Sequence, residues 1–492
     1  MSIVGCKWVF RVKTTPTGAI QRYKARLVAK GFHQIPGLDF GDTFSPVIKP
    51  SSLRIMFTLA VTYQWPIKQI DVNNAFLNGD LTEEVFMSQP EGFVSKQYPH
   101  YVCKLNKALY GLKQAPRAWF SKLKTALLDW GFKNSSADVK FFFQMTESSV
   151  LMLLVYVDDI LITGSNPLLI QQLITWLNSK FSLKSLGDVD FFLGFEVHRD
   201  STGLYLSQHK YILDLLKRTN LLDSKPMSSP YSVGVKLSAT DGIPFSDPTL
   251  YKSTLGALQY LTYTRPDLSF IVNKLSQFQQ HPTDLHWAAV KRVLRFLKSS
   301  LATGIVFRPA FSLSIEVFTD SDWAGDVDDR RSTSGVCVLL GGNLITWYSK
   351  KQSVVARSST EAEYRALALG VTDILWTSSL LRELGFHCST KPILWCDNTS
   401  ARALALNPVF HARTKHIEID VHFLREKLAA GLVELRYIPT DHQSADLFTK
   451  VLSTPRFHFL SSKLNLVSSP RFSLRGHVRD HKYYYEFFGS SC

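Results

Sequence analysis

The sequence predicts an α+β protein in which two mixed regions of strands and helices flank a helical, basic region. Strand-like and helix-like segments alternate from about residue 5 to residue 200. The pattern then turns helical and basic, before a second α/β region begins near residue 313. A chain of 492 residues is long enough for several domains, each with its own core. We expect four parts, with the last as a poorly ordered tail: 1–200, 201–312, 313–452 and 453–492.

Composition and charge favour a globular protein with a polyanionic partner. The formal net charge is +15, and Lys and Arg are concentrated in residues 1–50. This excess of positive charge favours binding to nucleic acid, although the charge alone is explained equally well by a basic surface that only keeps the protein soluble. No run of about 18 uncharged apolar residues occurs, so no membrane span is expected. The six cysteines lack a Cys-x-x-Cys pair, which argues against a zinc knuckle or disulfide framework and for a reducing compartment.

The first candidate site combines an acid at a strand end with an acid pair at a hairpin turn. Apolar runs at 150–155 and 160–163 predict two strands, with Asp158 and Asp159 at or near their turn. Adjacent ionised carboxylates repel each other, and burying them is unfavourable unless a cation neutralises them. Asp71 closes another short apolar strand and supplies a third acid, although alone it is more typical of a capping residue. We expect two Mg²⁺ ions about 4 Å apart between these acids.

A second set of acids occupies the C-terminal α/β region. Asp320 and Asp397 each end a strand. Glu363 lies in the first turns of a helix capped by Ser and Thr residues, and Asp446 comes near the start of a short helix. Each acid alone is explained as a cap or as a partner of a helix N-terminus. Together, the acids follow the order strand end, helix, strand end and helix, which separate capping roles do not explain. This order resembles the four-acid site of RNase H folds. Glu361 is the alternative to Glu363.

Several motifs resemble those of a known family. Segments 71–76 (DVNNAF) and 156–159 (YVDD) resemble the two metal-binding motifs of reverse transcriptases. More specifically, three segments are similar to the polymerase part of copia-type LTR retrotransposon Pol polyproteins: Tyr23–Gly31 (YKARLVAKG), Phe76–Leu81 (FLNGDL) and Leu109–Trp119 (LYGLKQAPRAW). The resemblance extends to about residue 468. It implies a right-hand polymerase fold of fingers, palm and thumb, followed by an α/β RNase H-like domain.

The resemblance also implies a role for each matched residue. The catalytic and metal-binding residues that it implies are Asp71, Asp158 and Asp159 for the polymerase, and Asp320, Glu363, Asp397 and Asp446 for the nuclease. Phe76 matches the aromatic steric gate, whose ring would collide with a ribose 2′-oxygen. Lys24 and Arg26, on a fingers-like hairpin, are expected to contact the incoming triphosphate. Gln114 belongs to the segment expected under the nucleotide and template, and is predicted to bind substrate.

These residues together predict an RNA-directed and DNA-directed DNA polymerase that also hydrolyses RNA in RNA–DNA hybrids. Its expected partners are an RNA template, a DNA primer, an RNA–DNA hybrid and deoxynucleoside triphosphates, with two Mg²⁺ ions per site and Mn²⁺ as the alternative. The expected location is a retrotransposon particle in the cytoplasm, or else the nucleus. Two other functions stay open: an inactive retrotransposon-derived remnant that only binds nucleic acid, and a nuclease with a dead polymerase.

Overall fold

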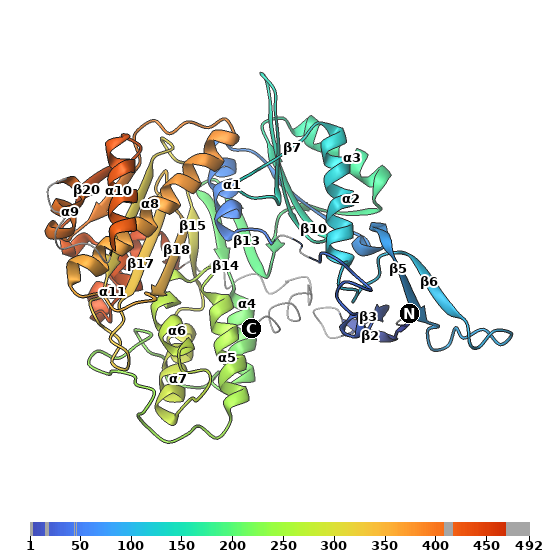
Figure 1. Cartoon of the computed structure of the whole chain (residues 1–492), viewed down its shortest axis with the longest axis horizontal. Helices are drawn as coiled ribbons and strands as arrows, with labels where there is room; N and C mark the ends of the chain where they lie inside the picture. The colour runs from blue at the N-terminus through green and yellow to red at the C-terminus, as the bar shows by residue number, and fades with distance from the viewer. Residues whose placement is uncertain (1–2, 15–18, 44, 46, 408–416, 469–492) are drawn as a thin grey trace. The chain divides into compact units, whose positions relative to one another are not determined.

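A computed structural model describes residues 3–14, 19–43, 45, 47–407 and 417–468 and divides into two compact units (Figure 1). Unit 1 contains the chain up to Leu53 together with Trp65–Val189, and unit 2 contains Arg54–Gln64 and the described chain from Asp190 onward. The division falls within helix α1 (Pro50–Thr62). No helix among the described residues combines the length and apolar character that crossing a bilayer requires.

The largest sheet of unit 1 has six strands in the order β11-β4-β10-β9-β8-β7. These strands are β4 (Ile67–Val72), β7 (Lys133–Asn134), β8 (Phe141–Met145), β9 (Val150–Tyr156), β10 (Asp159–Gly164) and β11 (Leu183–Asp188). Helices α2 (Ala115–Trp130) and α3 (Pro167–Lys180) cover one face of this sheet. The fold is therefore a mixture of helices and largely antiparallel sheet, as expected.

Two smaller sheets complete the described part of unit 1. Strands β2 (Cys6–Thr14) and β3 (Ile20–Ala29) form an antiparallel hairpin. A three-stranded sheet follows the order β1-β5-β6, with β1 (Ile3–Val4), β5 (Asp80–Ser88) and β6 (Val102–Lys107). Two short 3₁₀ helices accompany these sheets: η1 (Gly31–His33) follows β3, and η2 (Ala75–Asn78) connects β4 of the main sheet to β5.

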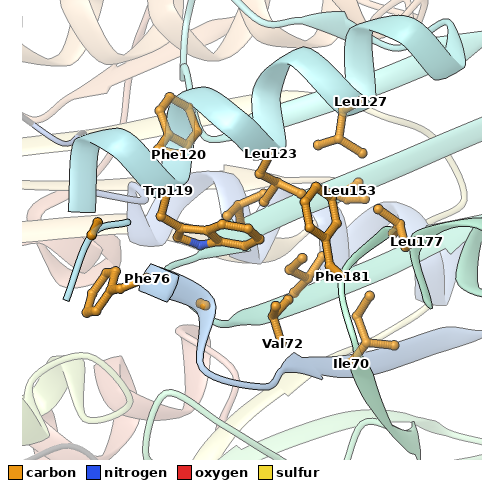
Figure 2. Packing of buried hydrophobic residues seen from close by; sticks show 14 of the residues in the cluster. Ile70, Val72, Phe76, Trp119, Phe120, Leu123, Leu127, Leu153, Leu177 and Phe181 are labelled. Atoms are coloured by element: carbon orange, nitrogen blue, oxygen red, sulfur yellow. The ribbon is translucent and has the colours of Figure 1, made fainter. Parts of the chain in front are cut away.

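Local sequence signals place the two helices on the sheet. Pro116 lies in the first turn of α2, and Gly131 ends it with a left-handed φ of 104°. Asn166 caps α3 by accepting bonds from the amides of Leu168 and Leu169. The buried core between the helices and the sheet contains Leu123 and Leu127 of α2, Leu177 of α3, and Ile70, Val72 and Leu153 of the strands (Figure 2).

Unit 2 contains two five-stranded sheets in its described part. The first follows the order β12-β13-β14-β15-β21, with β12 (Phe191–Phe192), β13 (Phe195–Asp200), β14 (Gly203–Ser207), β15 (Thr303–Phe307) and β21 (Leu466–Ser468). The second follows the order β18-β17-β16-β19-β20, with β16 (Ile315–Ser321), β17 (Thr333–Leu340), β18 (Asn343–Lys351), β19 (Ile393–Cys396) and β20 (Glu434–Tyr437).

The second sheet is the α/β region expected after residue 313. Strands β16, β17 and β18 are antiparallel, whereas β16, β19 and β20 are parallel. Parallel neighbours need a crossover, and helices provide it. The helices of this region are α8 (Ser359–Glu383), α9 (Thr399–Leu406), α10 (Glu418–Ala429) and the 3₁₀ helices η5 (Thr440–His442) and η6 (Ser444–Phe448).

The helical segment expected between 201 and 312 is not a separate domain in this structure. It holds α4 (His209–Arg218), α5 (Pro248–Leu261), η3 (Pro266–Leu268), α6 (Ser269–Ser276) and α7 (Asp284–Ser299). These helices share one buried core with Leu344 of β18 and Leu447 of η6. The expected boundaries at 200 and 312 therefore differ from the structural ones, because β13 pairs with β14 across position 200 and β15 pairs with β21 across position 312.

The expectation of a poorly ordered tail from residue 453 is wrong for residues 454–468. Helix α11 (Thr454–Lys463) buries Phe457 and Leu460, and β21 pairs with β15. The apolar residues recur at helical spacing over only three turns, so their pattern is too short to stand out from the sequence. The remainder of the expected tail, 469–492, lies outside the described residues.

Candidate functional sites

A strained two-residue turn presents the acid pair of unit 1. Tyr156 of β9 and Asp159 of β10 are register partners, which leaves Val157 and Asp158 in the turn between them. Val157 has a left-handed φ of 53°, an unfavourable conformation for a β-branched residue. The buried indole of Trp119 on α2 donates a hydrogen bond of 2.7 Å to the Val157 carbonyl and so fixes this turn.

The structure brings Asp71 next to this acid pair. Asp71 on β4 is the register partner of Asp159 on β10, so both side chains extend from the same face of the sheet. The amide of Val72 donates to the Asp158 carbonyl at 2.8 Å, which ties the turn to β4. Gln69 also donates to Asp159 Oδ1 at 3.3 Å. The three predicted acids of unit 1 are therefore neighbours in space.

Burial and mutual repulsion dominate the electrostatics of this acid group. Burial raises the pKa of Asp158 to about 6, with a further contribution from the negative charge of Asp71. Burial, followed by the charges of Asp158 and Asp71, raises the pKa of Asp159 well above its usual range. Neighbouring carboxylates whose charges repel each other and resist ionisation suit a hard divalent cation, which favours oxygen ligands.

The hairpin of β2 and β3 presents a basic face. Side chains alternate along a strand, so Arg22, Lys24 and Arg26 lie on one face of β3. Arg11 of β2 is the register partner of Lys24 and joins that face. Arg26 and Lys24 both lower the pKa of Asp158 against the larger effect of burial, which puts their charges within electrostatic reach of the acids.

Gly111 holds this hairpin close to the segment that leads into α2. Its φ is 93°, and a Cβ at this position would lie 2.1 Å from the carbonyl oxygen of Ala29, at the end of β3. The amide of Ala29 donates to the Tyr110 carbonyl at 2.7 Å. Only glycine allows both the backbone conformation and the close approach.

The predicted substrate contact of Gln114 is not supported by its surroundings. Gln114 is 2% exposed, accepts a bond of 3.0 Å from Gln34 and donates at 3.1 Å to the Asp39 carbonyl. Its amide therefore positions the loop around Asp39 from inside unit 1. Phe76 is also buried, with its ring edge-to-face against Tyr110 at 4.6 Å between centroids. Figure 2 shows the Phe76 ring at one end of the core cluster.

Three acids of unit 2 converge beside the mixed sheet. Asp320 is on β16, Asp397 directly follows the adjacent parallel strand β19, and Glu363 is in the second turn of α8. One carboxylate oxygen from each lies within 4.8 Å of the others. Glu361 instead accepts a bond from Arg365 at 2.9 Å, so it takes part in a largely buried ion pair within α8.

The electrostatics of these three acids also fit a cation. Burial raises the pKa of Asp320 to about 6, and burial followed by the charges of Asp320 and Asp397 raises the pKa of Glu363 well above its usual range. Glu363 Oε2 and Asp397 Oδ1 are buried and have no hydrogen-bond partner among the residues that the structure describes. Buried oxygens of this kind require a partner, and a divalent ion would provide it.

The fourth predicted acid, Asp446 of η6, is placed differently. It lies beside Asp320, but its carboxylate accepts bonds from Lys450 at 2.9 Å and from Arg456 at 2.5 Å. Helix η6 approaches the sheet closely because Gly335, the register partner of Asp320, has no side chain. A Cβ atom at this position would lie 2.8 Å from the Ala445 carbonyl oxygen.

Sequence reasoning did not identify Lys450 and Arg456. The spacing of four residues between Asp446 and Lys450 is the signal that could have indicated the first of them, because it allows an ion pair within one turn. Arg456 lies in another helix, and its contact with Asp446 depends on tertiary structure.

Two groups of fully or partly buried carboxylates, one of them beside a basic hairpin, are typical of metal-dependent proteins that act on phosphate groups of nucleic acids. A sequence profile described as "Reverse transcriptase (RNA-dependent DNA polymerase)" matches residues 1–233. The retrovirus-related Pol polyprotein from transposon RE2 of Arabidopsis thaliana is 50% identical over 470 residues, covering 96% of this chain and 32% of that polyprotein. A Ty5-1 transposon protein of Saccharomyces cerevisiae is 34% identical over 308 residues, covering 62% of this chain and 100% of the relative.

The chain belongs to the reverse transcriptase family of copia-type LTR retrotransposon Pol polyproteins. It spans about a third of the length of the Pol polyprotein from transposon RE2. Among solved structures, the foamy viral protease–reverse transcriptase in complex with RNA/DNA hybrid matches with a TM-score of 0.44 and 13% identity, over 88% of this chain and 51% of that one. At that TM-score the similarity does not define the fold, which follows from the strand orders above.

Proposed function

We propose that the chain is an RNA-directed and DNA-directed DNA polymerase that also hydrolyses the RNA of RNA–DNA hybrids. The observation that supports this function most strongly is the presence of two separate groups of fully or partly buried carboxylates, one in each unit. Family membership supports the polymerase assignment of unit 1. The acids of the mixed sheet support the nuclease assignment of unit 2.

The residues of unit 1 have distinct proposed roles in nucleotide addition. Asp71, Asp158 and Asp159 would hold Mg²⁺, or alternatively Mn²⁺. When bound, a divalent ion neutralises phosphate charge and activates a hydroxyl or a water as a nucleophile. Lys24 and Arg26 place positive charge beside the acids, where the triphosphate of an incoming deoxynucleotide would need it. Packing of the Phe76 ring against Tyr110 would hold it rigidly enough to exclude a ribose 2′-oxygen.

The residues of unit 2 would hydrolyse a phosphodiester of RNA paired with DNA. Asp320, Glu363 and Asp397 would hold the divalent ion, with Glu363 Oε2 and Asp397 Oδ1 as the oxygens that lack other partners in the described chain. Thr449 donates to the second oxygen of Asp320 and thereby orients this carboxylate. The proposed substrates are an RNA template with a DNA primer and the resulting hybrid, and the proposed location is a retrotransposon particle in the cytoplasm, or else the nucleus.

Paired substitutions test the two activities separately. In the full chain, we expect Asp158→Asn to lower primer extension on an RNA template at least about a hundredfold, because a carboxylate ligand is lost. Hydrolysis of a labelled RNA–DNA hybrid should stay near the wild-type rate. We expect Asp397→Asn to have the opposite effects. Equal loss of both activities in either variant would contradict separate sites, and a wild-type chain that binds the hybrid but catalyses neither reaction would favour the inactive remnant.

A further inference from the structure

A lysine lies between two of the four nuclease acids. Lys450 Nζ is 3.1 Å from Asp320 Oδ1 and 2.9 Å from Asp446 Oδ1. Both carboxylates are almost completely buried, whereas the lysine side chain is 37% exposed. An ammonium group in this position bridges two carboxylates from different elements, which is the arrangement that a shared metal ion would otherwise make.

Both carboxylate oxygens of Asp446 accept bonds from cationic donors. Its Oδ1 accepts from Lys450, and its Oδ2 accepts from Arg456 Nη2 at 2.5 Å. Charge-assisted hydrogen bonds of this kind are stronger than neutral ones and hold the carboxylate in a single orientation. A metal ion that used Asp446 as a ligand would lie next to one of these two cations, and repulsion between like charges would favour displacement of that cation.

Among the described residues, Glu363 and Asp397 each offer an oxygen without a donor, and Asp320 lies beside them. Glu363 Oε2 and Asp397 Oδ1 are buried without a hydrogen-bond partner in the described part of the chain, and they lie within 4.8 Å of each other and of an Asp320 oxygen. The four acids therefore differ in their surroundings. Asp320, Glu363 and Asp397 form a group that fits a metal ion, whereas Asp446 is already bonded to two cationic side chains, Lys450 and Arg456.

The charges of the site agree with this separation. The four carboxylates, when ionised, carry four negative charges, and Lys450 and Arg456 carry two positive charges against them. The remaining two negative charges equal the charge of one divalent ion. A second divalent ion would leave the site with a net positive charge unless Lys450 moved away.

We propose that the nuclease site binds one divalent ion at Asp320, Glu363 and Asp397, and that the Lys450 ammonium permanently takes the place of a second ion between Asp320 and Asp446. This inference rests on the proposed nuclease function and deepens it. Two N–H groups of the ammonium are used by the two carboxylates. The partly exposed lysine keeps its third N–H for an oxygen of the scissile phosphate.

Metal counting in the full chain tests this assignment. An Asp71→Asn, Asp158→Asn background removes ligands from the polymerase site, and Mn²⁺ binding is measured by equilibrium dialysis. In this background we expect one Mn²⁺ per chain, and loss of that ion on further substitution Asp397→Asn. Lys450→Met should raise the count to two, because Asp320 and Asp446 are then free to share an ion.

Two further variants control for changes in folding and charge. Lys450→Arg keeps the positive charge, so a chain with this substitution should still bind one ion at the nuclease site. If Lys450→Met does not fold, the ion count of Lys450→Arg tests the proposal in its place. Lys427→Met removes a lysine paired with Glu426 on the surface and should leave the count at one. Two ions at the nuclease site before any substitution of Lys450, or two ions in Lys450→Arg, would overturn the proposal.

The hybrid-hydrolysis assay separates this inference from the proposed function. If the chain binds a single Mn²⁺ as described but does not hydrolyse a hybrid, the proposed nuclease function fails and the metal assignment stands. If the chain hydrolyses the hybrid but binds two ions at this site, the function stands and the role of Lys450 is wrong.

Discussion

The turn that carries Asp158 depends on a residue in an unfavourable conformation. Val157 adopts a left-handed φ of 53°, which is rare for a β-branched side chain and raises the free energy of the turn by roughly 1–3 kcal/mol. Such a turn persists only where the surroundings stabilise it. The bond of 2.7 Å from the Trp119 indole to the Val157 carbonyl, and the bond from the Val72 amide to the Asp158 carbonyl, provide that stabilisation.

Replacing the donor on Trp119 tests this view of the turn. Trp119→Phe keeps an aromatic ring against Phe181 but removes the indole N–H. We expect a loss of about 1 kcal/mol in the positioning of Asp158 and therefore about a fivefold lower rate of primer extension. Hybrid hydrolysis in the same chain serves as the internal control and should not change. A primer-extension rate equal to that of the wild type would mean that β9 and β10 hold the turn unaided.

At the scale of elements, the N-terminus of helix α7 is capped by Thr283 together with His286, and the cap requires His286 to be neutral. His286 Nδ1 accepts a bond of 3.0 Å from the Thr283 amide, and its Nε2 lies 3.1 Å from the Ser238 carbonyl. Its ring stacks on Phe278 at 3.9 Å between centroids. Burial lowers the pKa of His286, although nearby acids, among them Asp328 and Asp284, partly oppose this effect.

The stability of α7 should therefore depend on pH. Because the folded state holds His286 with a lowered pKa, its contribution is complete above about 6.5, the usual value, and is lost as the pH falls below that value. We expect amide hydrogen exchange in α7 to accelerate between pH 7.5 and 5.5, after correction for intrinsic rates, by more in the wild type than in His286→Gln. The same acceleration in both proteins would assign the pH dependence to other groups.

Local pattern predicts elements and the acids at their ends, but not the partners that those acids find. The strands before Asp71, Asp320 and Asp397 follow from apolar runs that stop at a carboxylate, and a hairpin was expected around Asp158. The bond between Lys450 and Asp320 joins positions 130 residues apart, and no local period encodes it. The internal role of Gln114 was missed for the same reason, since Gln34 is 80 residues away.

At the scale of the whole molecule, the chain order and the structural units do not coincide. Residues Arg54–Gln64 precede most of unit 1 in the sequence and yet belong to unit 2. Arg54 is 6% exposed, and its guanidinium lies 3.6 Å from the ring centroid of Trp347 and donates to the carbonyls of Ile345 and Tyr263. Burial lowers the pKa of Arg54 to about 9, so its hydrogen bonds and the aromatic ring must replace much of its lost hydration.

A fragment that begins at Asp190 should therefore be incomplete. Without Arg54, the carbonyls of Ile345 and Tyr263 lose a charged donor. The apolar surface that α1 covers is also exposed, including the ring of Phe307, which Phe57 meets edge-to-face in the full chain. We expect a fragment of residues 190–468 to unfold about 10 °C below the corresponding transition of the full chain. Addition of a peptide of residues 50–64 should restore most of this difference, whereas the same peptide with Arg54→Met should restore less. A fragment that unfolds at the temperature of the full-chain transition, and does not bind the peptide, would show that unit 2 is stable without α1.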